Sequence, residues 1–384
     1  MCRFARTALT TQSPQSRVHL PLRLSDRWEI SDAEQDDGRE SSGPSLFAPC
    51  RDGLRVMERR VFVRIVTGVL VLVVPFGPRA QTGTTIRRIG WLGFGAPTPP
   101  AVLEERNALL RELGWIEGQN LLIERRFANG NAELLDPLAE ELVRLKVELI
   151  VAEGTNVTMA AKKATTATPI LMWSAGDPVG TGLVASLARP GSNVTGYSLL
   201  SPETDVKRLS LLRELLPAAQ RVGELENSTN PLFRAKRKGL EQAYRSVGMQ
   251  PFFIEIARAS ELEDAIADVT RKRAQVLHVP NDDLFEDNVS GIMGAASRHA
   301  LPPIADRVHV FLEAGALLSY GFSVAELQRR GAAFIDKILR GAKPGDLPVE
   351  QPRQFELGIN LKTAKTLGIT VPQALVLRAD RVIQ

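Results

Sequence analysis

The sequence predicts an α/β protein of two lobes, each built around a parallel β-sheet. Short apolar runs at residues 147–152 and 170–173 are typical of strands that are buried on both faces of such a sheet. A segment with helical periodicity follows each run, as expected where a crossover joins two parallel strands. The same alternation starts again after Pro217, so we expect two strand–helix units of similar size.

The first unit contains a clear strand–loop–helix pattern at residues 170–196. The apolar strand is followed by a small-residue loop, Asp177 can cap the next helix, and Pro178 suits its first turn. The stop signal around Pro190 ends this helix before an extended run at 193–196. In chain order we expect strands at 86–94, 120–126, 147–152 and 170–173, and helices at 102–113, 134–145, 154–163 and 179–187.

The second unit repeats the alternation without repeating the sequence. We expect strands or extended runs at 221–225, 251–256, 275–279, 303–305, 315–322 and 355–359. We expect helices at 203–216, 231–247, 262–272, from 283 to His299, and at 324–339, followed by a turn at 341–345 and a short segment at 362–367. Right-handed crossovers then give each lobe a parallel sheet.

Composition argues against nucleic-acid binding. The formal net charge of the 384-residue chain is +4, but much of the excess comes from arginines in the first 80 residues. The remainder is close to neutral and lacks the basic balance of a nucleic-acid-binding domain. With 44% apolar residues, the chain can bury a sizeable core.

Residues 57–80 have the pattern of a secretory signal. Arg59 and Arg60 form a basic start, residues 65–74 an apolar core, and Ala80 offers a cleavage site. The alternative interpretation of this segment is a membrane span. The apolar run is shorter than the roughly 20 residues that a span needs. Residues 1–56 lack an apolar period, and we interpret them as a mis-called extension ahead of a true start at Met57, or as a disordered tail.

The two cysteines, Cys2 and Cys50, both lie in that extension. A mature chain that begins after the signal would contain no disulfide and no thiolate metal site. It would also lack a cysteine for lipid attachment, so we expect an exported periplasmic protein without a lipid anchor.

The sequence offers no recognisable catalytic constellation. Its histidines lack metal-ligand spacing, and no nucleophile elbow or phosphate-binding loop occurs. We interpret His278, in an apolar strand, as a core or cleft residue, and Asp282 and Asp283 as helix caps. We therefore expect no enzyme activity, cofactor or metal; an enzyme on a doubly wound fold and a secreted sensory module are the alternatives.

Residues 177–196 carry a family resemblance. The run Asp177-Pro178-Val179-Gly180, followed by the segment from Arg189-Pro190-Gly191 to Asn193-Val194-Thr195-Gly196, resembles the ABC-transporter substrate-binding family that includes tryptophan- and tyrosine-binding proteins. The resemblance covers residues 87–384 and includes Leu113-Gly114-Trp115 and the segments 318–321 and 347–352.

The resemblance implies a type I periplasmic-binding-protein architecture with two Rossmann-like (flavodoxin-like) lobes. The N-lobe would comprise residues 87–198 and 321–343, and the C-lobe residues 199–320 and 344–384. The chain would cross between the lobes near Leu199, Gly321 and Pro344, forming a three-crossing hinge. The implied function is a monomeric solute-binding component of an ABC importer, with a small-molecule solute and an inner-membrane permease with its ATPase as partners.

In such a protein the solute lies between the loops at the carboxyl ends of the strands. Thr155, Asn156 and the amides after them could hold an anionic group at a helix start. Asp282 or Asp306 could face a cation, and Tyr320 could cover a planar part of an amino-acid-like solute. The expected ligand-binding residues are Phe94, Gly95, Thr155, Asn156, Gly176, Asp177, Asn227, Asn281, Asp282, Asp306 and Tyr320.

Overall fold

The computed structural model describes residues 86–199 and 202–384. The interpretations of residues 1–56 as an extension and 57–80 as a signal, and those of Cys2 and Cys50, lie outside the described residues.

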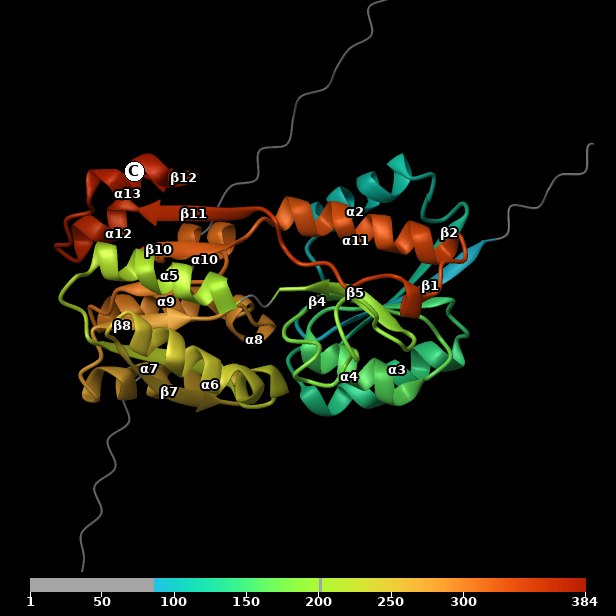
Figure 1. The fold of residues 1–384 in the computed structure, drawn as a ribbon, viewed down its shortest axis with the longest axis horizontal. Coiled ribbons are helices and arrows are strands. Elements are labelled where there is room, and N and C mark those ends of the chain that lie inside the picture. The colour runs from blue at the N-terminus through green and yellow to red at the C-terminus, as the bar shows by residue number, and fades with distance from the viewer. Residues whose placement is uncertain (1–85, 200–201) are drawn as a thin grey trace, which may run out of the picture. The chain divides into compact units, whose positions relative to one another are not determined.

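The first lobe is built on a five-stranded sheet with the order β2-β1-β3-β4-β5 (Figure 1). All of its neighbouring strands are parallel, as the apolar runs predict. The strands are β1 (Arg87–Gly93), β2 (Leu121–Phe127), β3 (Leu149–Ala152), β4 (Ile170–Ala175) and β5 (Val194–Ser198).

Helices cover both faces of this sheet. The short 3₁₀ turn η1 (Ala132–Leu134) leads into α3 (Leu135–Arg144), which packs with α4 (Thr155–Ala164) on one face. The other face is covered by α2 (Pro100–Glu112) and α11 (Val324–Leu339) (Figure 1). Because side chains alternate along a strand, Ile150 packs in the core on the side of α3 and α4, and Val151 packs in the core on the side of α2 and α11.

The second lobe contains a seven-stranded sheet with the order β12-β11-β10-β9-β8-β6-β7. Its strands are β6 (Arg221–Asn227), β7 (Gln250–Ile256), β8 (Val276–Val279), β9 (Pro303–Ala305), β10 (Leu318–Phe322), β11 (Phe355–Asn360) and β12 (Arg381–Ile383). The expectation of a wholly parallel sheet is wrong at one place, since β11 runs antiparallel to β10. The chain reaches β11 on its way back from the first lobe and therefore runs along β10 in the opposite direction.

The helices of the second lobe are α5 (Pro202–Leu215), α6 (Pro231–Ser246), α7 (Leu262–Arg271), α8 (Asp283–Glu286), α9 (Val289–Arg298), α10 (Val308–Ala314), α12 (Leu361–Thr366) and α13 (Gln373–Arg378), with the 3₁₀ turns η2 (Ala259–Glu261) and η3 (Pro344–Asp346). Leucines of α5 and α6 share one core with β6, β8 and β10, while α7 and α9 contribute to another.

The chain passes between the lobes after β5, after β10 and before β11. The last passage differs from the expected one near Pro344. Thr195 Oγ1 donates to Leu347 O at 2.7 Å, and the amide of Glu350 donates to Gly196 O at 2.9 Å. These bonds hold the segment to β5 of the first lobe, so the return begins after Glu350.

The helix expected at 179–187 does not form. Asp177 Oδ1 accepts from the Gly180 amide at 2.9 Å and Asp177 O accepts from the Thr181 amide at 3.0 Å, which makes one turn. Gly182 then adopts a left-handed φ of +74°, which ends the turn.

The helix expected from 283 to His299 is two helices, α8 and α9. The side chain of Asn288, at the break, donates Nδ2–H to Leu284 O at 2.8 Å and so takes the place of a continuing backbone bond. The helix α10 between β9 and β10 was not expected from the sequence.

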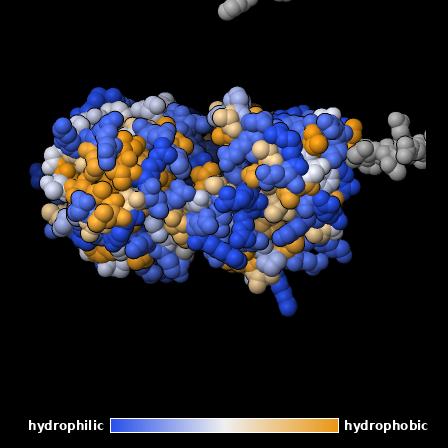
Figure 2. All heavy atoms as spheres, turned by 90° about the horizontal axis from the view of Figure 1, so that it is seen from above, coloured by the Kyte–Doolittle hydropathy of each residue, from blue (hydrophilic) through white to orange (hydrophobic). Residues whose placement is uncertain are grey.

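Hydrophilic residues cover much of the face seen in Figure 2, with a group of hydrophobic residues on the seven-stranded lobe. Within residues 86–199 and 202–384, the structure contains no helix with the length and apolar character that crossing a membrane requires.

Two helix glycines provide a test of the packing of α11 on β4. A Cβ at Gly331 would lie 2.2 Å from the Trp173 ring, whereas nothing lies within 4 Å of a Cβ at Gly239 in α6. We expect Gly331→Ala to lower the free energy of unfolding by about 1–3 kcal/mol through overpacking. Gly239→Ala should raise it by about 0.5–1 kcal/mol through the helix propensity of alanine. Urea titration measures both; stabilisation by both changes would contradict this packing.

Candidate functional site

Loops at the carboxyl ends of the strands surround a cavity lined by both lobes. Parallel strands place these ends at one edge of each sheet, which brings their loops together. The five-stranded lobe contributes Phe94, the start of α4, Ser174 and Gly176, and the seven-stranded lobe contributes α5, α6 and the segments around Asn281 and Asp306. We call this space, of about 80 Å³, the interlobe cavity. It is several times larger than the roughly 10–15 Å³ that one water molecule needs.

The structure brings many of the expected ligand-binding residues together here. The lining includes Phe94, Thr155, Asn156, Gly176, Asn281, Asp282 and Asp306. The remaining four expected residues, Gly95, Asp177, Asn227 and Tyr320, are not among the residues that line it.

Each of those four has another role in the structure. Gly95 lies at a contact between the lobes, where a Cβ would meet Asp287 Oδ2 at 2.6 Å. Asp177 holds the turn that replaces the expected helix. Asn227 donates Nδ2–H to Asp282 at 2.9 Å. The ring of Tyr320 stacks on Phe355 at 5.9 Å, and Phe355 lines the cavity in its place.

The start of α4 faces the cavity from the five-stranded lobe. Gly154, Thr155 and Asn156 line it, and no side chain caps the helix at Gly154. The hydroxyl of Thr155 instead accepts from the Gly176 amide at 3.0 Å and so fixes the neighbouring loop. Asn156 Oδ1 accepts from the Val157 amide at 2.9 Å, which leaves the amides of Thr155 and Asn156 without an intrahelical acceptor. Such amides at the positive end of a helix favour an anionic group.

Asp282 is tied into its own lobe. Its Oδ1 accepts from Asn227 and from the Leu284 amide, at 2.9 and 3.0 Å, and its Oδ2 accepts from Asn230 Nδ2–H at 2.8 Å. Burial raises the pKa of Asp282, an effect that the two asparagine hydrogen bonds partly oppose. The carboxylate therefore caps α8, as the sequence suggested, and shapes the cavity wall.

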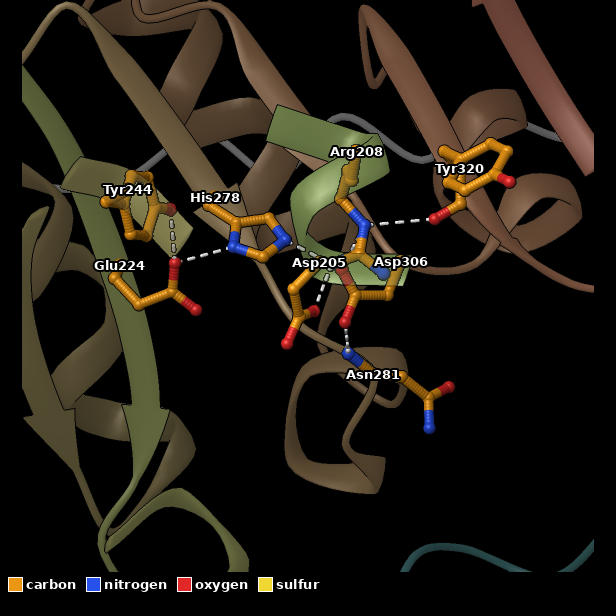
Figure 3. Close-up of polar contacts among 8 residues, drawn as sticks. All are labelled: Asp205, Arg208, Glu224, Tyr244, His278, Asn281, Asp306 and Tyr320. Carbon is orange, nitrogen blue, oxygen red and sulfur yellow. Dashed lines mark hydrogen bonds and ion pairs between the residues drawn. The ribbon is translucent and has the colours of Figure 1, made fainter. Parts of the chain in front are cut away.

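A chain of buried charges runs through the seven-stranded lobe beside the cavity (Figure 3). His278 contacts Glu224 Oε2 through Nδ1 at 2.6 Å and Asp306 Oδ1 through Nε2 at 2.7 Å. Arg208 pairs with Asp306 at 2.9 Å and with Asp205 at 2.8 Å. The exposed fractions of Glu224, His278 and Arg208 are 0%, 1% and 4%, so the members of this chain depend on one another for neutralisation.

The chain of buried charges also connects several helices and strands of this lobe. Glu224 on β6 and His278 on β8 are register partners and point to the same face of the sheet, where Tyr244 of α6 donates its O–H to Glu224 at 2.6 Å. Arg208 of α5 donates Nε–H to Tyr320 O on β10 at 3.0 Å. Asp306 Oδ2 accepts from the Asn281 amide at 3.3 Å, which fixes the loop before α8.

The pKa values of His278 and Asp306 shift in opposite directions from their usual values. Burial would lower the pKa of His278, but the carboxylates of Glu224 and Asp306 outweigh it and raise the pKa to about 9. Burial would raise the pKa of Asp306, but Arg208 and His278 outweigh it and hold that pKa well below its usual range. At neutral pH the imidazolium donates both N–H groups to its carboxylate partners.

Sequence reasoning missed Asp205, Arg208 and Lys236, which reach the cavity from α5 and α6. Their helices were expected, but the helical pattern did not show which polar side faces the other lobe. The charge chain left one usable signal: His278 interrupts the apolar strand β8, and Glu224 lies between apolar residues in the buried strand β6. A pair of opposite charges in buried strands indicates a buried ion pair.

Residues 103–383 match the protein family described as ABC transporter substrate binding protein. The chain is 30% identical over 261 residues to the Tyrosine-binding protein of Clostridioides difficile (strain R20291), covering 68% of this chain and 74% of that protein.

Two solved structures share the fold. A conserved domain protein from Vibrio cholerae has a TM-score of 0.73 at 26% identity, and an ABC domain in complex with L-Trp from Streptococcus pneumoniae has 0.72 at 24% identity. Each comparison covers 78% of this chain and 100% of the other. These likenesses confirm the type I periplasmic-binding-protein architecture expected from the sequence.

The raised pKa of His278 predicts a specific pH dependence of stability. Its stabilising charge is fully present below the unfolded pKa of about 6.5 and is lost as the pH rises through about 9. Between these values the wild type should lose roughly 3 kcal/mol of unfolding free energy that His278→Gln does not lose. Chemical denaturation at pH 6–9.5 measures the difference.

The control is His299→Gln, which alters a half-buried histidine at the end of α9 that is not part of the charge chain, so the loss of stability caused by His278 should persist in this variant. Parallel pH profiles for wild type and His278→Gln would show that His278 is not charged in the folded protein.

Proposed function

The chain belongs to the ABC transporter substrate binding protein family, and from this premise we propose that it is the solute-binding component of an ABC importer. The observation that carries the proposal is the interlobe cavity, whose walls come from both lobes and from the strand-end loops. Members of the family bind solutes, and the paired state of Asp282, Asp306 and Arg208 suits binding rather than catalysis.

Closure of the two lobes around the solute is the second part of the proposal. The Ala96 amide donates to Asp287 Oδ2 across the lobes at 2.9 Å. Gly176 lies so near α6 that a Cβ there would meet Leu232 at 2.4 Å. Contacts of this kind form when the lobes approach, and the passages between the lobes can act as a hinge.

We propose an amino-acid-like solute with an apolar or aromatic side chain. The start of α4 suits a carboxylate, while Phe94, Phe322, Phe355 and Leu199 supply apolar surface. The name of the Clostridioides difficile relative, Tyrosine-binding protein, supports this class of solute.

The proposed location is the periplasm. The signal-like pattern at residues 57–80 supports export, and the family supports delivery of the solute to an inner-membrane permease with its ATPase. We propose that the exported protein acts as a monomer without a lipid anchor.

A thermal-shift screen of the purified protein against amino acids and aromatic acids tests the solute class. A solute at 100 times its Kd should add about 2.7 kcal/mol to the free energy of unfolding. We expect L-tyrosine or a related amino acid to give such a shift, and titration calorimetry to confirm one site. If neither method detects binding of any amino acid, the proposed solute class is wrong.

The cross-lobe hydrogen bond of Asp287 tests closure. Asp287→Ala removes an interaction made between the lobes and should raise the Kd of the identified solute about two- to tenfold. Asp287→Asn keeps an acceptor oxygen and is the matched control, with a Kd near that of the wild type. Solution scattering should show a smaller radius of gyration for the wild type at saturation, and an unchanged radius would contradict closure.

A further inference from the structure

Two basic residues line the interlobe cavity, and Lys236 is the one that does not belong to the chain of buried charges described above. It lies in α6, lines the cavity and is half-buried. Its Nζ lies 4.7 Å from the centroid of the Phe233 ring, three residues earlier in the same helix. Within the described residues its side chain forms no ion pair or hydrogen bond at normal distance, and it acts on Asp282 and Asp306 only through its charge, which lowers the pKa of both.

The other ionisable groups of the cavity either have partners or favour their neutral form. Asp283 is of the second kind, because burial and the neighbouring carboxylates raise its pKa well above its usual range. Arg208 is held by Asp205 and Asp306. Asp306 has both oxygens occupied, by Arg208 and His278 on one side and by the Asn281 amide on the other. Asp282 accepts three hydrogen bonds within its own lobe. A solute that enters the cavity therefore meets the ammonium of Lys236 as an available positive charge.

The opposite wall of the interlobe cavity also favours a negatively charged group. The start of α4, with the uncapped Gly154, lines the same cavity from the five-stranded lobe, and α4 and α6 lie against each other. An anionic group between them would face the positive end of a helix on one lobe and an ammonium on the other. Such a group also favours closure, because it interacts with both lobes only when they approach.

We propose that Lys236 is a specificity-determining residue that selects solutes carrying a carboxylate and holds that carboxylate against the start of α4. This inference rests on the proposed function, since it names the chemistry of the group that the same cavity recognises. It assigns the selection to a helix side chain of this chain rather than to the strand-end loops alone.

The experiment compares an acid with its neutral amide. L-Tyrosine and L-tyrosinamide share the ring and the amino group but differ in the carboxylate. Where the screen identifies another amino acid, that acid and its amide replace them. Calorimetry gives the Kd of both for the wild type, Lys236→Met and Lys236→Arg. Lys238→Met, which alters an exposed lysine of the same helix, is the control.

The wild type should prefer the acid to the amide. Lys236→Met should weaken binding of the acid about ten- to a hundredfold and leave binding of the amide within about twofold, so that the preference collapses. Lys236→Arg should retain most of the preference, and Lys238→Met should match the wild type. Melting curves without solute check that each variant is folded.

Two results would overturn the inference while leaving the proposed function intact. One is a wild type that binds acid and amide equally. The other is a Lys236→Met variant that loses the same factor for both, or loses nothing. Failure of the wild type to bind any amino acid would instead overturn the proposed function, and this inference with it.

Discussion

The buried charge chain from Glu224 through His278 and Asp306 to Arg208 is the interaction on which the site depends. Removing a charge from water is unfavourable unless the charge has partners. The charge chain is therefore stable only when all of its members are present. Its members lie on β6, β8, the loop after β9, and α5, and Arg208 also binds the backbone of β10 at Tyr320. The charge chain therefore fixes the relative position of the passage that enters this lobe at α5 and the passage that leaves it after β10, together with the cavity wall between them.

Much of the fold follows from local pattern. Buried apolar runs gave the parallel strands, and helical periodicity gave elements such as α11, whose bounds match the expected range. The differences arise where local pattern conflicts with distant contacts or with turn chemistry. The direction of β11 depends on a return path held by Thr195 and Glu350, and the turn at Asp177 ends because Gly182 is left-handed.

The site was predictable in place but not in detail. Strand-end loops meet at one edge of a parallel sheet, and this topology alone located Thr155, Asn281 and Asp306. The role of each side chain depends on its neighbours in space. The sequence around Asn227 does not indicate its hydrogen bond to Asp282. Helical periodicity likewise does not show that Lys236 faces the other lobe. Helix periodicity separates apolar from polar faces, but it does not distinguish solvent from a solute.

The place of α11 in the first lobe has a consequence for biosynthesis. One face of the five-stranded sheet, including Trp91 and Trp173, is covered partly by α2 and partly by α11, which begins at Val324, after most of the other lobe in sequence. A nascent chain that has completed β5 still lacks α11, and so the part of this face that α11 covers remains open to its surroundings. The core of the N-terminal lobe therefore cannot be completed before the chain has passed through most of the other lobe, whereas N-terminal domains of multidomain chains usually fold first. Until the ribosome has added Leu339, the emerging polypeptide retains a hydrophobic surface of the kind that chaperones and export factors recognise.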